Sequence, residues 1–111
     1  MLPRFQRLNL KTDFKWVTTG KKIETKFTRI FFKNGDNVLP RLGIALSGKV
    51  FRKATQRNRV KRLISQAFAC LYNLLPGHIN IVVLPKSEVI GVKSPEVLLD
   101  LEKGLKNEKI L

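Results

Sequence analysis

The clearest hydrophobic pattern lies in residues 52–75, where apolar side chains recur every three or four positions. This spacing is typical of an amphipathic helix. Thr55 is the expected N-cap, and Pro76-Gly77 is the expected end. The predicted buried stripe is Val60, Leu63, Ile64, Ala67, Leu71, Leu74 and Leu75. The other predicted elements are arranged around this helix.

Two segments before the helix have strand patterns. Residues 22–33 are rich in β-branched and aromatic residues, which predicts one strand. Its alternation puts Phe27, Arg29 and Phe31 on one face and Thr28, Ile30 and Phe32 on the other. The turn signal at residues 34–37 then predicts a hairpin with a second strand over residues 41–47. We expect Gly43 to be a close-packing position in that strand.

Residues 1–19 precede these strands and carry many cations. Residues 1–10 are interpreted as an extended basic arm. Residues 11–19 predict a short helix closed by Gly20. Phe14 and Val17 would share one face of this helix, and Trp16 would lie off that face.

After the long helix, residues 78–84 form a nearly continuous apolar run, as in a strand that is covered on both faces. Residues 85–93 are interpreted as a loop that could include a further short strand over residues 89–92. Ser94-Pro95 then predicts the start of a last helix. Its apolar stripe would be Val97, Leu98, Leu101 and Leu105. The predicted order is αββαβα in one domain, residues 1–111, which corresponds to an α+β, two-layer sandwich.

The net charge of +14 is concentrated in the first part of the chain. Residues 1–62 hold 17 Lys or Arg against three acids, whereas residues 63–111 hold five Lys against five acids. Such one-sided charge is expected of a nucleic-acid-binding protein. A membrane surface would attract the same charge, but no apolar run has the length of a spanning helix and no signal-peptide core is present. We therefore expect a cytoplasmic protein without a membrane partner.

The first turns of the predicted long helix carry many cations. Cations at this end of a helix destabilise it. A helix N-terminus already carries a partial positive charge, so cations in the first two turns repel it and each other. With a bound polyanion, the cations and the helix N-terminus would all take part in favourable interactions instead of repulsive ones. The alternative is a plain solvated basic face, which this placement disfavours. The basic residues from Arg52 to Arg62 are Arg52, Lys53, Arg57, Arg59, Lys61 and Arg62.

Several catalytic chemistries have no matching pattern. The eight acids are scattered, and one cysteine and one histidine cannot form a zinc site. Cys70 is expected to be a packing residue and His78 to lie at a turn. No P-loop or dinucleotide fingerprint is present, so no small-molecule substrate is expected. If the protein takes part in catalysis, its own side chains are not expected to perform it.

The segment Arg57-Asn58-Arg59-Val60-Lys61-Arg62-Leu63 resembles the RNR signature of the bacterial ribonuclease P protein family. The Arg41–Ser47 strand, the ten-residue step from Ser47 to Arg57, Arg7-Leu8 and Asp13-Phe14 also fit the family pattern. The resemblance covers roughly residues 5–105. It implies a left-handed βαβ crossover, which is rare. It also implies removal of the 5′ leader from precursor tRNA by an RNA subunit that carries the catalytic magnesium ions.

The resemblance also implies roles for individual residues. The ribozyme-binding residues would be Lys49, Arg52, Lys53, Arg57, Asn58, Arg59, Lys61 and Arg62. Asn58 could alternatively satisfy the first helical turn. The leader would bind in a cleft between the first helix, the sheet and the long helix. Phe14 would line this cleft, with Ile30 or Phe32 opposite. Each of these three residues could equally be plain core.

Four positions depart from the family pattern. Thr18 stands where a second cleft aromatic is usual, and Trp16 is expected to compensate. Gly48, Ser65 and Ala69 stand where basic residues are frequent. The alternative functions are a structural, ribosomal-type RNA-binding protein and a DNA-binding regulator with a helix in the major groove. A protein-only nuclease is the least favoured, because metal ligands are lacking.

Overall fold

A four-stranded sheet with three α-helices makes up the computed structural model, which describes residues 6–110. The strands are β1 (Lys21–Glu24), β2 (Thr28–Asn34), β3 (Arg41–Ile44) and β4 (Ile79–Pro85). The helices are α1 (Leu10–Thr18), α2 (Ala54–Leu71) and α3 (Ser94–Asn107). Short 3-10 turns follow α2 at Tyr72–Leu74 and β4 at Ser87–Val89. The α+β class is confirmed, with one strand more than the three of the predicted αββαβα order.

The strand order is β1-β2-β4-β3, so β4 lies in the middle of the sheet. It pairs antiparallel with β2 and parallel with β3. The predicted hairpin between the strands now labelled β2 and β3 is therefore wrong. In a β2–β3 hairpin, β4 would have to lie outside the pair, whereas its burial on both faces suits a central position. The β3–α2–β4 connection is a parallel crossover, and its left-handed sense stays a prediction of the resemblance.

The predicted single strand over residues 22–33 is two strands joined by a turn at Thr25–Phe27. A residue that is distant in the sequence holds this turn in place. The Asp100 carboxylate on α3 accepts the backbone N–H groups of Lys26 and Phe27, both at 3.1 Å. Thr25 Oγ1 also accepts the Thr28 N–H. A contact across more than 70 residues leaves no periodic signal, so the pattern alone predicted an unbroken strand.

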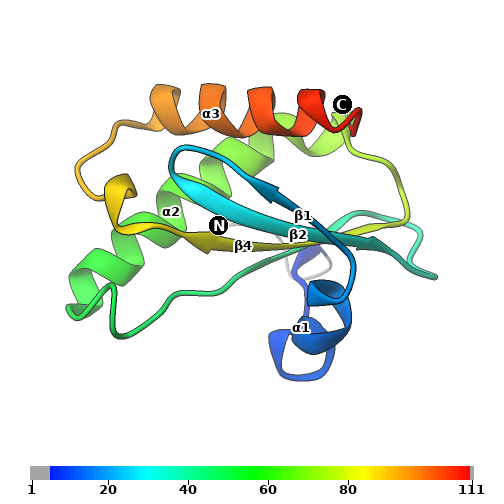
Figure 1. Ribbon diagram of the computed structural model, residues 1–111, viewed down its shortest axis with the longest axis horizontal. Coiled ribbons are helices and arrows are strands. Elements are labelled where there is room, and N and C mark those ends of the chain that lie inside the picture. Colours follow the sequence, from blue (N-terminus) through cyan, green and yellow to red (C-terminus); the bar gives the residue numbers. More distant parts are fainter. Residues whose placement is uncertain (1–5, 111) are drawn as a thin grey trace.

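The helices cover both faces of the sheet (Figure 1). Helices α2 and α3 pack together on one face, and α1 lies on the other. The large core between the sheet and α2/α3 includes Ile30, Ile81, Phe68 and Leu101. A smaller cluster under α1 is built on Leu8, Val17 and Val82. Helix α1 therefore adds a partial third layer to the predicted two-layer sandwich.

Helix α2 buries most of its predicted stripe, with differences at its ends. Val60, Ile64, Ala67 and Leu71 are buried as expected, and Phe68 joins them. Leu74 is 61% exposed, because the helix gives way to a 3-10 turn at residue 72 and its periodicity ends there. The prediction that Cys70 packs inside is wrong, since it is exposed.

The start of α2 is two residues earlier than predicted. Lys53, not Thr55, is the N-cap, and no side chain caps the helix. No acid lies in the first turn. The free N–H groups and the adjacent cations are thus left for solvent or a bound anion.

Other local features of the structure agree with the predictions in some places and differ from them in others. Gly43 is a close-packing position, because an added Cβ would lie 2.6 Å from Leu10 Cδ2. His78 lies in a turn. Residues 89–92 do not form a strand. Helix α3 has Lys93 as its N-cap, with Pro95 in the first turn. Among the described residues no helix is long and apolar enough to cross a membrane.

Replacing Asp100 by Ala should lower the free energy of unfolding by about 2 kcal/mol, because two backbone N–H groups lose a charged acceptor. Urea denaturation measures this change. Glu102→Ala on the same helix is the control. It removes a partly exposed ion pair with Lys106, so its expected cost is below about 0.5 kcal/mol. Equal costs for the two variants would contradict the proposed lock on the β1–β2 turn.

Tyr72, the one tyrosine of the chain, should titrate at higher pH in the folded protein than in urea. Burial raises the pKa of its phenol above the ordinary value, and its hydroxyl donates to the Pro40 carbonyl at 2.9 Å. The contribution of Tyr72 to the free energy of unfolding is therefore complete at pH values below the pKa of the unfolded state. It is lost as the pH rises through the pKa of the folded state. The phenolate absorbance band reports the titration directly. Identical midpoints with and without urea would refute this expectation.

Candidate nucleic-acid interface

The first three turns of α2 present most of the predicted ribozyme-binding residues to solvent. Asn58, Arg59, Lys61 and Arg62 are exposed. The Asn58 side chain has no hydrogen bond to any other described residue. The alternative in which Asn58 satisfies the first helical turn therefore has no support, and its amide is available to an external partner.

The connector between β3 and α2 extends this basic surface. Ser47 organises it: its hydroxyl accepts the Lys49 N–H at 3.2 Å, and its carbonyl accepts the N–H groups of Val50 and Phe51. Phe51 is fully buried and anchors the segment. Because of this anchor, the exposed side chains of Lys49, Arg52 and Lys53 are held beside the start of α2.

Arg57 differs from the other cations because part of its guanidinium is already engaged. Its Nη1 donates to the carbonyl of Phe51 at 2.8 Å and to that of Arg52 at 3.2 Å. These bonds fasten the connector to the helix. Arg57 is therefore a positioning residue for its neighbours, whatever contact its remaining N–H groups make.

The cations of α2 do not all point the same way. Arg59 lies toward the loop after β4, where Nη2 approaches the Val92 carbonyl at 3.5 Å, and it shares a shallow hollow with Arg62. Lys61 points to the other side, toward β3. A partner that contacts all of them must wrap around the helix. RNA, with phosphates along a curved backbone, has the required shape and charge.

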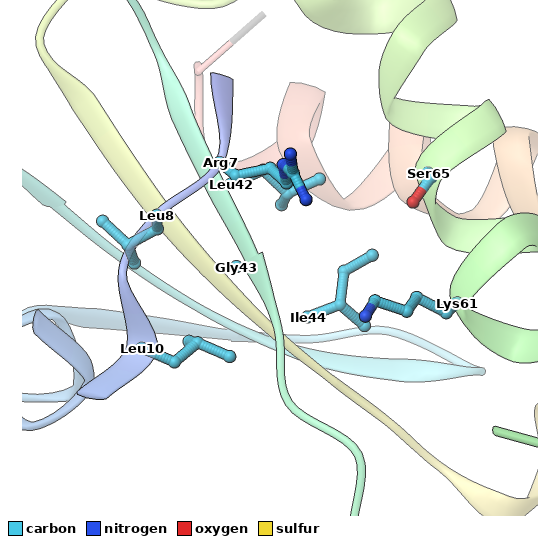
Figure 2. Close-up of a pocket in the computed structure, with 8 residues that line it drawn as sticks. All are labelled: Arg7, Leu8, Leu10, Leu42, Gly43, Ile44, Lys61 and Ser65. Carbon is cyan, nitrogen blue, oxygen red and sulfur yellow. The ribbon is translucent and has the colours of Figure 1, made fainter. Parts of the chain in front are cut away.

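The hollow on the Lys61 side has a volume of about 130 Å³. Figure 2 shows the residues that line it. Its walls are residues 7–10, strand β3 and helix α2. Arg7 and Lys61 extend toward the gap from opposite sides. The Ser65 hydroxyl also points there, although the residue is only 6% exposed. Two cations and a hydroxyl donor around so small a volume suit one phosphate group.

The predicted arm over residues 1–10 is partly built into this site. Arg7 forms a parallel bridge with Leu42, and the Leu8 N–H donates to the Leu42 carbonyl at 2.8 Å. Leu8 is buried. The chain is therefore fixed against the edge of β3 from residue 7 onward. Residues 1–5 of the predicted arm lie outside the described residues.

A second surface lies beside α1, on the other face of the sheet. Phe14 is half-buried there and belongs to the same cluster as Phe31, Leu84 and Ala45, which are also half-buried. Arg29, two residues before Phe31 on β2, is exposed. Apolar rings and a cation beside an exposed sheet face suit unpaired RNA bases and their phosphates.

This arrangement corrects the residues predicted to lie opposite Phe14. Ile30 is fully buried beneath α2 and α3, and Phe32 packs against the same core. Neither can share a cleft with Phe14, because alternate residues of a strand point to opposite faces. Phe31 occupies that place. Alternation placed Phe31 and Phe32 correctly on opposite faces, but it could not show which face α1 would cover.

Trp16 also lies away from Phe14. It borders a different hollow, formed with the loop after β2 and the first residues of β3 and β4. Its exposed fraction is 38%, and Lys33 Nζ lies 5.1 Å from the ring centroid. The expectation that Trp16 replaces the missing cleft aromatic at position 18 is therefore wrong.

Electrostatic compensation is sparse around these surfaces. Glu24 lies 3.0 Å from Arg29 and 3.4 Å from Lys86. The hydrogen bond from Arg29 is the main cause that lowers the pKa of the Glu24 carboxyl, and Lys86 adds to it. Among residues 6–110, no ion pair involves a cation of α2 or of the connector, and no group of three or more His, Cys, Asp or Glu could hold a metal ion.

Comparison with known proteins gives a consistent result. A family model described as Ribonuclease P matches residues 2–109. The ribonuclease P protein component of Methylococcus capsulatus is 34% identical over 102 residues, which cover 91% of this chain and 79% of the relative. That of Legionella pneumophila (strain Lens) is 39% identical over 82 residues, 73% of this chain and 69% of the relative.

Solved structures extend the similarity to the fold. A structure of RNase P protein from Thermotoga maritima, in complex with 1-(4-fluorophenyl)-2-thiourea, has a TM-score of 0.81 at 31% identity. The match covers 90% of this chain and 97% of that one. RNase P protein from Staphylococcus aureus shares the fold, with a TM-score of 0.79 at 24% identity over 95% of this chain and 96% of that one.

Proposed function

Because this chain belongs to the ribonuclease P protein family, and is therefore the protein component of a tRNA-processing endoribonuclease, we propose that it binds the catalytic RNA through α2 and the precursor-tRNA leader beside α1. The observation that carries the proposal is the set of cations on the uncapped start of α2, which have no anionic partner among the described residues. Their arrangement favours a polyanion.

The ribozyme-binding surface would consist of three parts. Lys49, Arg52 and Lys53 on the connector meet phosphates on one side of the α2 N-terminus. Arg59 and Arg62 meet them on the other, and the hollow between Arg7 and Lys61 takes a single phosphate. Each neutralised phosphate releases counterions, so affinity should fall steeply with salt.

The leader would bind on the α1 side. Phe14 and Phe31 offer ring surface to unpaired bases, and stacking on aromatic rings requires no particular sequence. Arg29 stands beside this surface to meet the leader backbone. Binding the leader and the ribozyme at once would fix the scissile phosphodiester relative to the catalytic RNA, which is catalysis by positioning.

We propose that the RNA subunit holds the catalytic magnesium ions, which when bound supply Lewis-acid activation of water and of the leaving oxygen. This chain's own part is to neutralise RNA phosphates and to hold the leader in register. A cytoplasmic location is part of this proposal, because the protein would there meet precursor tRNA.

The direct test is cleavage of precursor tRNA at low magnesium with a bacterial ribonuclease P RNA alone, the protein alone, and both together. We expect efficient cleavage at the mature 5′ end only from the pair. If the protein binds the RNA without raising cleavage, it acts as a structural RNA-binding protein and the proposal fails. Cleavage by the protein alone would require an active site among its own residues.

Gly48→Lys should strengthen RNA binding severalfold. A Cβ at Gly48 meets nothing within 4 Å, so a lysine fits without strain and adds a cation to the exposed connector. One more phosphate contact should steepen the dependence of log K on log salt by roughly one. Gly48→Ser is the control for the backbone change. Equal RNA affinity of the lysine and serine variants would show that the connector lies outside the RNA interface.

A further inference from the structure

The hollow beside Trp16 is separate from both RNA surfaces described above. It has a volume of about 290 Å³, near the lower end of small-molecule sites, and lies at the end of the sheet where β3 and β4 begin. Its lining is Asp13, Trp16, Gly35, Asp36, Asn37, Arg41 and Asn80. An indole wall with several polar groups around one small volume is unlike the apolar surface beside Phe14.

The acids of this hollow are unusual for their part of the chain. Residues 1–62 contain only three acids, and two of them, Asp13 and Asp36, are here. The third, Glu24, is paired with Arg29 and Lys86. Neither Asp13 nor Asp36 forms an ion pair with any described residue. Asp13 also has a favourable interaction with the N-terminus of α1. Asp36 lies in a loop and has no such role.

Asn80 gives an independent indication of a ligand. The residue is only 3% exposed, and its Nδ2 donates to Asn37 Oδ1 at 2.8 Å and to the Lys33 carbonyl at 3.3 Å. Its Oδ1 has no hydrogen-bond partner among the described residues. Every fully enclosed side-chain N or O atom of the described residues has a partner, so Asn80 Oδ1 keeps contact with solvent, and Asn80 lines the hollow. The site thus offers a fixed acceptor in addition to the two carboxylates.

The indole of Trp16 is held in place on two sides. Its far edge lies against Gly35, where an added Cβ would be 2.8 Å from Trp16 Cη2. Lys33 lies over one face of the ring, and its ammonium is fixed by Thr19 Oγ1 at 2.9 Å. A flat ligand would therefore stack on the other face.

We propose that this hollow binds an unpaired guanine base of RNA. Guanine carries N1–H and N2–H₂ side by side on its Watson–Crick edge, and a carboxylate accepts such a pair with two hydrogen bonds. Asp13 or Asp36 supplies that carboxylate, Asn80 Oδ1 accepts the remaining N–H, and Trp16 stacks on the ring. Arg41, exposed at the rim, meets the phosphate.

Trp16 is the only tryptophan, so its fluorescence reports the site in the intact protein. The experiment titrates the protein with guanosine 5′-monophosphate and with inosine 5′-monophosphate, which lacks only the exocyclic amine. Non-specific attraction of the phosphate to this basic protein is the same for both. We expect saturable quenching by the guanine nucleotide, with half-saturation at a concentration at least about fivefold lower than for the inosine nucleotide.

Variants assign the preference to the carboxylates. Asp13→Asn and Asp36→Asn are tested singly and together, and the pair should reduce the preference for the guanine nucleotide to the part that Asn80 Oδ1 supplies. Glu108→Gln, an exposed acid beyond α3, should leave the ratio unchanged. Arg41→Ala should weaken both nucleotides and keep the ratio. Equal half-saturation of the two nucleotides by the unsubstituted protein, or a ratio that the double substitution leaves unchanged, would overturn the proposal.

Competition identifies the source of the base. A single-stranded leader RNA and a ribonuclease P RNA are each added to protein that is loaded with the guanine nucleotide. Displacement by the leader assigns the site to the substrate, and displacement by the ribozyme alone assigns it to the holoenzyme. The readout needs no cleavage, so failure here leaves the proposed function of α2 and the α1 surface untouched.

Discussion

Arg57→Ala is expected to lower both the stability of the free protein and its affinity for ribonuclease P RNA. The guanidinium holds the Phe51 and Arg52 carbonyls at 2.8 and 3.2 Å, and its loss leaves the connector unfastened. Hydrogen bonds from a charged donor imply a cost of about 2 kcal/mol in the free energy of unfolding. RNA binding should then weaken by more than the loss of one charge explains, because Arg52 and Lys53 lose their positions.

Arg62→Ala is the matched comparison, because the residue is exposed and makes no hydrogen bond with the described residues. It should leave the free energy of unfolding unchanged within about 0.5 kcal/mol. It should also lower the salt slope of RNA binding by about one. Lys103→Ala on α3 removes the same charge elsewhere and should change neither quantity. Urea denaturation and RNA binding at several salt concentrations measure both. Equal stability of the Arg57 and Arg62 variants would show that the connector does not depend on Arg57.

Phe31→Leu should weaken binding of precursor tRNA by at least about fivefold, since stacking on an aromatic ring is worth about 1–3 kcal/mol per base. The loss should disappear for tRNA without a leader, because Phe31 lies with Phe14 on the α1 side of the sheet. Binding is measured with the reconstituted ribonucleoprotein at fixed salt.

Phe32→Leu is the sharpest control that the chain offers. The same change one residue further along the strand lies on the opposite face, against the α2/α3 core. It should alter the stability of the protein and leave leader binding within about twofold. If Phe32→Leu weakens leader binding and Phe31→Leu does not, the leader lies elsewhere than beside α1.

The features predicted correctly from the sequence are those that local pattern determines. Helix α2 and the buried strand β4 were predicted from periodicity and apolar runs, and the basic surface from the charge of residues 1–62. The missed features are set by distant contacts. Asp100 on α3 holds the turn at residues 25–27 through hydrogen bonds. Strand β4 lies between β2 and β3, which were expected to pair with each other.

The same limit applies to the site. A run of cations in the sequence shows that α2 is basic, but not that Arg57 is turned back onto the connector. Alternation separates Phe31 from Phe32, yet only the packing of α1 shows which of them is near Phe14. The hollow beside Trp16 combines residues from α1, the loop after β2 and the first residues of β3 and β4. No spacing along the chain predicts that these residues meet.

The central place of β4 has a consequence for the order of events during synthesis. Strands β2 and β3 both pair with β4, and neither pairs with the other. A nascent chain that has emerged only to residue 78 can form the β1–β2 hairpin and α2, but it has no strand to join them. Closure of the sheet must wait for residues 79–85, when most of the protein has been made. Until then the polypeptide carries its whole charge excess in residues 1–62, exposed on a surface that has not yet been organised.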